Sequence, residues 1–310
     1  MITAAKATAV ETRHVLSDDE RQIEQTVLAG IHRLFSNPNG NQRETYDTLI
    51  ATTPIADGVT LETIDTDGVS GWWVRPTGAP EDRAILFLHG GAYLLGSATA
   101  YRGLASQVAV RTGVATFVAD YPLAPENVFP AAPEAAASLR RWLGRQGQGV
   151  SQVALVGDSA GGGLALSVLG DATATTPAIA AVAVFSPWLD LALTGASFAS
   201  PDIHDPIFQP EMLAGPASAY LAGADPKDGR ASPLYAVPDV LPPLLIQVGG
   251  DEILLDDARR YAQAAADKGG EVRLDIFEGL HHVFQGATRD LPSARSALDT
   301  VAAFLNRHWA

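Results

Sequence analysis

Short apolar runs alternate with helical patterns along most of this chain. Six runs are nearly continuous in hydrophobic residues, which predicts strands covered on both faces rather than strands with one face in water. They lie at residues 84–88, 114–119, 152–156, 179–185, 244–248 and 272–277. Between the runs, apolar residues recur at helical spacing, as at Leu298, Val301, Ala302 and Leu305. This alternation predicts an α/β fold, a mainly parallel sheet with helices on both faces.

An antiparallel pair of strands is predicted ahead of this alternating region. Residues 59–64 and 71–74 are rich in β-forming side chains, and the turn-like Asp67-Gly68 separates them. These two strands would extend one edge of the sheet.

Two further segments interrupt the alternation. Residues 1 to about 55 contain a capping box, Ser17 with Glu20, and behind it an apolar stripe from Ile23 to Phe35. Ten of the 20 prolines lie between residues 187 and 243, around a predicted helix at 211–221. We therefore expect an N-terminal cap segment, residues 1–55, and one catalytic domain, residues 56–310, whose cap insertion spans about 188–230.

Composition and charge restrict the partners of the protein. Hydrophobic residues make up 47% of the 310 residues, which suits a packed core. A net charge of −14 disfavours nucleic acid and anionic membranes as partners. The absence of cysteine excludes disulfides, thiol nucleophiles and thiolate metal sites. Residues 1–20 have no apolar signal-peptide core, so a cytoplasmic location is expected.

The strongest candidate for chemistry is the segment Gly157-Asp158-Ser159-Ala160-Gly161. It follows a predicted strand and precedes a run of small residues that can form a helix, which is the setting of a nucleophile elbow. The turn would expose the Ser159 hydroxyl at the edge of the sheet, beside a helix N-terminus that favours negative charge. The alternative is a glycine-rich turn with an incidental serine, and the flanking strand and helix favour the nucleophile.

A nucleophile of this kind needs donors for the oxyanion that forms during acyl transfer. The segment His89-Gly90-Gly91-Ala92-Tyr93 follows an early strand, where one such donor is expected. Its small residues allow the amides of Gly91 and Ala92 to approach a substrate oxygen, and Ala160 supplies a third amide. We interpret His89 as a brace for this loop rather than as the catalytic base.

The acid and the base are predicted after the next two strands, because chain order in this fold is nucleophile, acid, base. Asp251 follows the strand at 244–248, and the pair His281-His282 follows the strand at 272–277. Asp256 and Asp257 are rivals of Asp251, but they fall within a helical pattern. The residues alone do not separate His281 from His282.

Taken together, these motifs resemble the hormone-sensitive-lipase-like carboxylesterases, often called bacterial family IV. The resemblance runs from about residue 84 to residue 284 and is looser in the N-terminal segment. It rests on six motifs in order: HGGAY at 89–93, DYPLAPENVFPAA at 120–132, GDSAGG at 157–162, SPWLDL at 186–191, GGDEILLDD at 249–257 and GLHHVF at 279–284.

The resemblance implies an α/β-hydrolase fold with an eight-stranded, mostly parallel sheet and a helical cap. It selects His282 as the base, since the family's histidine stands two residues before a phenylalanine, here Phe284. It also selects Asp251 as the acid and the amides of Gly91, Ala92 and Ala160 as the oxyanion hole. The chemistry expected of these residues needs no metal and no cofactor, and a homodimer is suggested by the resemblance alone.

One departure from the family is Ala92, which stands where relatives usually have a third glycine. The amide donor remains, but the methyl group narrows the space beside it. We expect esters of bulky tertiary alcohols to be poor substrates for this reason.

The predicted function is hydrolysis of short- to medium-chain esters by a Ser159–His282–Asp251 triad through an acyl-enzyme. Activity should rise with pH through the ionisation of a histidine near its ordinary pKa of about 6.5. Tyr93, Trp188 and Phe208 are predicted to line the substrate pocket, although each could instead be core packing. The alternatives are lactone hydrolysis by the same triad and a non-catalytic ligand receptor on a hydrolase scaffold.

Overall fold

The computed structural model describes residues 9–36, 40–146, 149–170 and 176–309, so parts of the predicted N-terminal segment (1–8 and 37–39) lie outside it. In the described residues, nine strands form a single sheet in the order β1-β9-β8-β7-β6-β4-β5-β3-β2. The strands are β1 (Val10–Val15), β2 (Val59–Thr66), β3 (Val69–Pro76), β4 (Arg83–Leu88), β5 (Thr116–Asp120), β6 (Gln152–Asp158), β7 (Ala178–Phe185), β8 (Leu244–Gly249) and β9 (Val272–Glu278).

The sheet is mostly parallel, as predicted. Among the strands that the structure describes, only the pairs β2·β3 and β3·β5 are antiparallel. All eight strands predicted from the sequence are present, with boundaries that differ by a few residues. The central strands β4, β6, β7 and β8 are buried on both faces, which explains why their sequences lack polar alternation.

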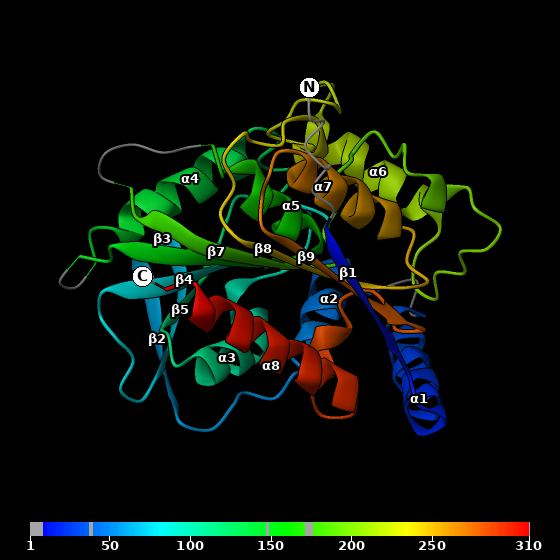
Figure 1. Ribbon diagram of the computed structural model, residues 1–310, viewed down its shortest axis with the longest axis horizontal. Helices are drawn as coiled ribbons and strands as arrows, with labels where there is room; N and C mark the ends of the chain where they lie inside the picture. Colours follow the sequence, from blue (N-terminus) through cyan, green and yellow to red (C-terminus); the bar gives the residue numbers. More distant parts are fainter. Residues whose placement is uncertain (1–8, 37–39, 147–148, 171–175, 310) are drawn as a thin grey trace, which may run out of the picture.

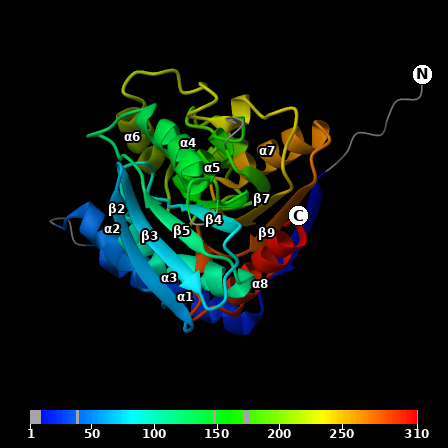
Figure 2. The same ribbon diagram turned by 90° about the vertical axis from the view of Figure 1, so that its left-hand side faces the viewer.

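Helices cover both faces of the sheet (Figure 1). On one face lie α4 (Ala131–Leu143), α5 (Ser159–Ser167) and α7 (Leu255–Asp267), whose apolar side chains belong to the larger core cluster. On the other face lie α3 (Ala98–Thr112) and α8 (Pro292–Arg307), which form the second core cluster with the opposite sides of the same strands. Figure 2 shows the twist of the sheet between these two layers. The α/β fold is therefore confirmed.

Strand β1 corrects the expectation that residues 1–55 serve only as a cap. It pairs in parallel with β9, from Val10 opposite Arg273 to Val15 opposite Glu278, and makes the sheet one strand longer than the predicted eight. The six residues of β1, VETRHV, do not alternate regularly between polar and apolar side chains, and the strand is largely exposed at the edge of the sheet. Its sequence therefore carried no clear strand signal.

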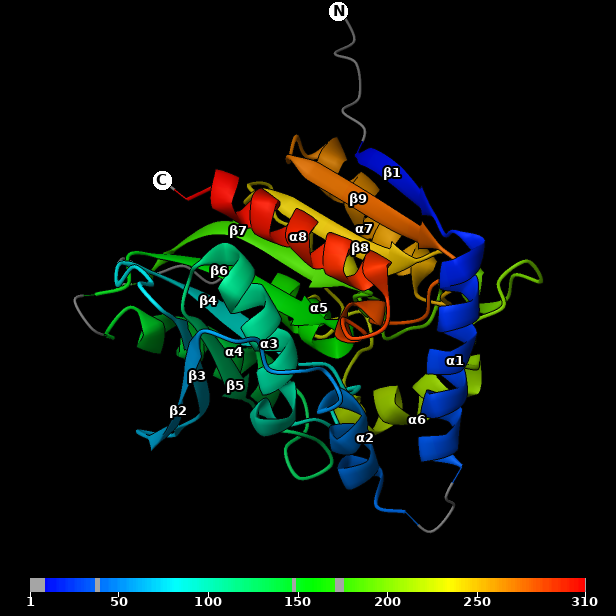
Figure 3. The same ribbon diagram turned by 90° about the horizontal axis from the view of Figure 1, so that it is seen from below.

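Three helices stand at one end of the sheet: α1 (Asp18–Phe35), α2 (Gln42–Ile50) and α6 (Pro210–Leu221) (Figure 3). Helix α1 begins where predicted, because the Ser17 hydroxyl accepts the Glu20 amide. The reverse half of the capping box is absent, since the Glu20 carboxylate accepts the amide of Ser293 at the start of α8 instead. Among the described residues, no helix combines the length and apolar character needed to cross a membrane.

Candidate active site

Ser159 lies in a sharp turn between β6 and α5. Strand β6 ends at Asp158, the helix begins at Ser159, and the serine has a φ of 50°, a conformation that a non-glycine residue adopts only where its surroundings impose it. Gly161 must be glycine, because a Cβ there would meet the carbonyl oxygens of Leu88 and His89. The turn can therefore pack directly against the end of β4.

The loop after β4 brings a second run of residues with positive φ to the same place. Gly91, Ala92 and Tyr93 have φ values of 109°, 54° and 63°. Gly91 and Ala92 line the same cavity as Ser159, and Ala160 is buried at the N-terminus of α5. The sequence-predicted oxyanion residues are thus brought close to the serine.

His89 is buried behind this loop. Its Nδ1 lies 2.7 Å from the Gly90 carbonyl oxygen, and its ring stacks on Tyr121 with the centroids 4.4 Å apart. The Tyr121 hydroxyl donates to the His89 carbonyl oxygen. Burial lowers the pKa of the imidazole, so His89 is held neutral. These contacts support the interpretation of His89 as a brace.

The acid that holds His282 is Glu252. Its Oε2 lies 2.7 Å from the Nδ1 of His282, and the Glu252 side chain is fully buried. The prediction of Asp251 in this position is therefore wrong. Asp251 lies among Glu278, His204 and Arg21, and burial followed by the charge of Glu278 raises the pKa of its carboxyl.

The local geometry explains why Glu252, rather than its neighbour Asp251, reaches His282. Glu252 folds back so that its Oε1 accepts the Gly249 amide and the Ser186 hydroxyl, both at 2.6 Å. Position 249 needs a glycine, because a Cβ there would overlap the Leu280 carbonyl oxygen and would also come within 2.8 Å of that Glu252 oxygen. Chain order alone could not distinguish two adjacent carboxylates, and the sequence differs between them only in the longer side chain of Glu252.

The pKa of His282 is the balance of opposing effects. Burial lowers it, because the charged imidazolium is poorly solvated, but the charge and hydrogen bond of Glu252 raise it more. Asp205 and Asp158 add to the rise through their charges. The net pKa is above the ordinary value, which differs from the expectation of an unperturbed histidine.

A cavity of about 1070 Å³ joins these residues to the three helices at the end of the sheet. Ser159, Gly91, Ala92 and His282 line its floor, and α1 lines much of the remainder with the apolar stripe predicted from the sequence: Ile23, Val27, Ile31, Leu34 and Phe35. The stripe therefore faces the cavity as well as the core. An apolar chamber with a serine, a histidine and clustered amides at one point is suited to acyl transfer.

Comparison with known proteins agrees with this geometry. Residues 85–286 match the sequence model of a protein family whose description is 'alpha/beta hydrolase fold'. An acetyl-hydrolase of Streptomyces hygroscopicus is 42% identical over 234 residues, 75% of this chain and 78% of its own. An esterase of Acinetobacter venetianus is 34% identical over 266 residues, 84% and 87% of the two chains.

A crystal structure of an esterase from the bacterial hormone-sensitive lipase family superposes with a TM-score of 0.84. The two sequences are 36% identical, and the match covers 94% of this chain and 99% of that one. This chain belongs to the hormone-sensitive-lipase-like, family IV esterases. It is a carboxylesterase, and its substrates are small-molecule esters.

Two of the three predicted pocket residues of this esterase are core residues instead. Tyr93 and Trp188 are 1% and 0% exposed and do not line the cavity. The Tyr93 ring stacks on Tyr220 of α6 at 4.0 Å between centroids and lies 6.3 Å from the Trp188 ring. The Tyr93 side chain packs against α6 instead of lining the cavity. The prediction that these two contact substrate is wrong.

Phe208, the third predicted residue, does line the cavity of the esterase. Asp205 fixes the turn that carries it, since Oδ1 accepts the amides of Ile207 and Phe208. The other oxygen, Oδ2, accepts the amide of Ile253, next to Glu252. One carboxylate thus connects the cap insertion with the loop that carries the acid.

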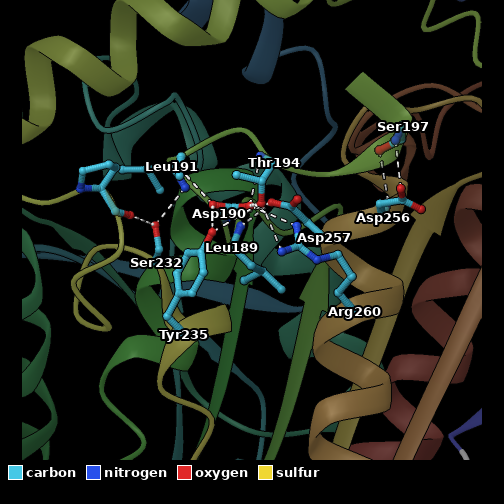
Figure 4. A network of polar contacts seen from close by, with 12 residues as sticks. Leu189, Asp190, Leu191, Thr194, Ser197, Ser232, Tyr235, Asp256, Asp257 and Arg260 are labelled. Carbon is cyan, nitrogen blue, oxygen red and sulfur yellow. Dashed lines mark hydrogen bonds and ion pairs between the residues drawn. The ribbon is translucent and has the colours of Figure 1, made fainter. Parts of the chain in front are cut away.

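The rival carboxylates Asp256 and Asp257 have other partners (Figure 4). Asp257 accepts the amides of Leu189 and Asp190, and burial raises its pKa to about 8. Asp256 accepts the amide of Ser197. Arg260 pairs with Asp190 at 2.9 Å in the same network. These contacts fasten the segment after β7 to α7 and so support the base of the cap insertion.

Asp158, beside the nucleophile, is also fully buried. It accepts the Gly90 amide at 3.0 Å and the Tyr101 hydroxyl at 2.8 Å. Burial raises its pKa to about 7, although these hydrogen bonds and the nearby His282 oppose the rise. The contact with Gly90 ties the turn at Ser159 to the loop that follows β4 in the esterase.

Proposed function

We propose that this carboxylesterase hydrolyses short- to medium-chain esters with Ser159 as nucleophile, His282 as general base and Glu252 as the acid that orients the imidazole. The observation that carries the proposal is the hydrogen bond of Glu252 to Nδ1 of His282 within a cavity that Ser159 also lines. A carboxylate on Nδ1 fixes the tautomer in which Nε2 is free to accept a proton.

The reaction proceeds in two halves. As the Ser159 oxygen attacks the ester carbonyl, its proton passes to Nε2 of His282, and the amides of Gly91, Ala92 and Ala160 bind the oxyanion. The tetrahedral intermediate then collapses, the C–O bond to the alcohol breaks, and the alcohol leaves with the proton from His282. Water repeats the sequence on the acyl-enzyme and releases the carboxylic acid.

The walls of the cavity, rather than its size, support the proposed range of substrates. A volume of about 1070 Å³ lies near the upper end of that of typical small-molecule sites and is bounded by α1, α2 and α6. A bounded apolar chamber suits single dispersed esters better than emulsified fats. We therefore expect p-nitrophenyl butyrate to be hydrolysed faster than the palmitate ester.

The test combines Ser159→Ala with covalent labelling. Wild-type protein should be labelled by a fluorophosphonate at Ser159, identified by peptide mass spectrometry, and should hydrolyse p-nitrophenyl butyrate. Ser159→Ala should abolish both while its circular dichroism spectrum is unchanged. Labelling at another residue, or turnover by Ser159→Ala within tenfold of wild type, would contradict the proposal. A parallel γ-lactone assay separates ester from lactone preference.

A further inference from the structure

A buried carboxylate of the cap helix contacts the loop that carries the proposed base. Glu24 of α1 is 4% exposed, and its Oε1 accepts two hydrogen bonds from a single residue, His281. The donors are the backbone amide of His281, at 3.0 Å, and its ring Nδ1, at 2.7 Å. His281 is itself 4% exposed and lines the cavity.

The loop after β9, which carries His281 and His282, has a strained backbone that contacts with other segments must stabilise. His282 follows His281 directly, and Val283, the next residue, has a φ of 57°, which is costly for a β-branched side chain. On the far side of His282, the Val283 amide donates to the Ser186 hydroxyl, which itself donates to Glu252. His282 therefore lies between two fixed neighbours: His281 is bound by α1, and Val283 is bound by the catalytic domain.

Attachment of α1 to the domain does not require Glu24. Leu16 and the partly buried Ile23 pack in the cluster formed with Phe277 and Leu280, and the Glu20 carboxylate accepts the Ser293 amide. Burying a carboxylate in addition is expensive, because the charge loses its hydration. The second oxygen of Glu24, Oε2, is buried without a hydrogen-bond partner. Because α1 is already anchored by other contacts, the unfavourable burial of the Glu24 carboxylate indicates that Glu24 has a role other than attaching the helix.

We propose that Glu24 is a positioning residue of the active site: its two hydrogen bonds to His281 set the position of the His282 ring, so the cap helix contributes directly to turnover. This inference rests on His282 being the base, as proposed above. Since displacement of a catalytic group by about 1 Å can reduce rate a hundredfold, loss of this hold should reduce kcat. Loss of these hydrogen bonds should leave the apolar walls of the cavity, and therefore KM, largely unchanged.

Three substitutions separate reach from charge. Glu24→Gln keeps the length of the side chain and an oxygen acceptor but removes the charge. Glu24→Asp keeps the charge but is one methylene shorter, and Glu24→Ala removes both. We expect kcat for p-nitrophenyl butyrate to fall about tenfold or more in the Asp and Ala variants, with KM within about threefold, and the Gln variant to retain most of the activity.

A second readout identifies the affected step. The rate of Ser159 labelling by a small fluorophosphonate depends on activation of the serine and little on the cavity walls, so it should fall in parallel with kcat. Gln25→Ala is the matched control, because Gln25 is exposed and adjacent on α1. It should match wild type. Thermal unfolding of each variant establishes that it is folded at the assay temperature.

Several results would overturn the inference. They are a Glu24→Asp variant with wild-type kcat, a change in KM alone, or a Gln variant as impaired as the Asp variant. If Glu24→Ala does not fold, the comparison of Gln with Asp still decides. Failure of the proposed function is distinguishable, because it would appear as activity or labelling that persists in Ser159→Ala, whatever the Glu24 variants show.

Discussion

The Phe208 ring and the His282 imidazole meet edge to face, with the ring centroids 4.9 Å apart and the planes at 76°. Phe208 belongs to the cap insertion and His282 to the loop after β9, so this contact joins the two parts of the site. It also covers the imidazole, which contributes to the burial that lowers the pKa of His282 against the effect of Glu252.

Replacing Phe208 by alanine should therefore reduce catalysis without unfolding the protein. An aromatic edge-to-face contact contributes about 0.5–1.5 kcal/mol, which corresponds to about 2- to 10-fold in kcat/KM. The measurement is steady-state hydrolysis of p-nitrophenyl butyrate by Phe208→Ala, with Phe208→Tyr as a control that keeps the ring. Equal activity of the Ala and Tyr variants would show that the ring has no role.

The pH dependence of kcat/KM should report the raised pKa of His282. The imidazole must be neutral to accept the serine proton, so activity rises as pH passes the pKa. Because Glu252, Asp205 and Asp158 together raise that pKa, the midpoint should lie above 6.5. A midpoint at or below 6.5 in wild-type protein would contradict this assignment.

Asp158 provides the control for that profile, since its own pKa is raised to about 7 and falls in the same range. In Asp158→Asn the midpoint should persist and move slightly lower, because one of the charges that stabilise the imidazolium is removed. If the ionisation disappeared in this variant, the profile would belong to Asp158 rather than to His282.

Gly30 in α1 should limit which acyl chains fit. It lines the cavity, and a Cβ built on it meets nothing within 4 Å, so a larger side chain would enter free space. We expect Gly30→Leu to lower the ratio of octanoate to acetate ester hydrolysis about tenfold. Gly30→Ala should keep the ratio and stabilise the helix by about 1 kcal/mol, measured by urea unfolding. An unchanged ratio in Gly30→Leu would be evidence against this role.

Ala92 should determine tolerance of bulky alcohols. It adopts a φ of 54°, where glycine is relaxed and alanine is strained, and its methyl group lies in the cavity beside the proposed oxyanion hole. Ala92→Gly should raise the ratio of tertiary to primary ester turnover, assayed with tert-butyl and n-butyl acetate. A constant ratio would refute the steric explanation.

The sequence predicted the parts of the site that depend on strands. Ser159 and the loop at Gly91 follow buried strands and lie where chain order requires, because the backbone alone fixes them. Side-chain direction was less accessible. Tyr93 stacks on Tyr220 and does not line the cavity, and Glu252 rather than Asp251 reaches His282; neither follows from the order of residues along the chain.

Contacts between distant segments were also missed. Strand β1 is stabilised by pairing with β9 rather than by its own pattern, and Glu24 is buried only because α1 brings it to His281. Such pairings become visible only when the fold is known.

The central claim is that Glu252, and not Asp251, orients the base of a serine esterase. The most direct test is the rate at which p-nitrophenyl acetate acylates the enzyme, measured as the pre-steady-state burst. Glu252→Gln should lower this rate about 10²- to 10⁴-fold, whereas Asp251→Asn should leave it within about threefold of wild type. The reverse order, a large loss in Asp251→Asn and little change in Glu252→Gln, would contradict the account.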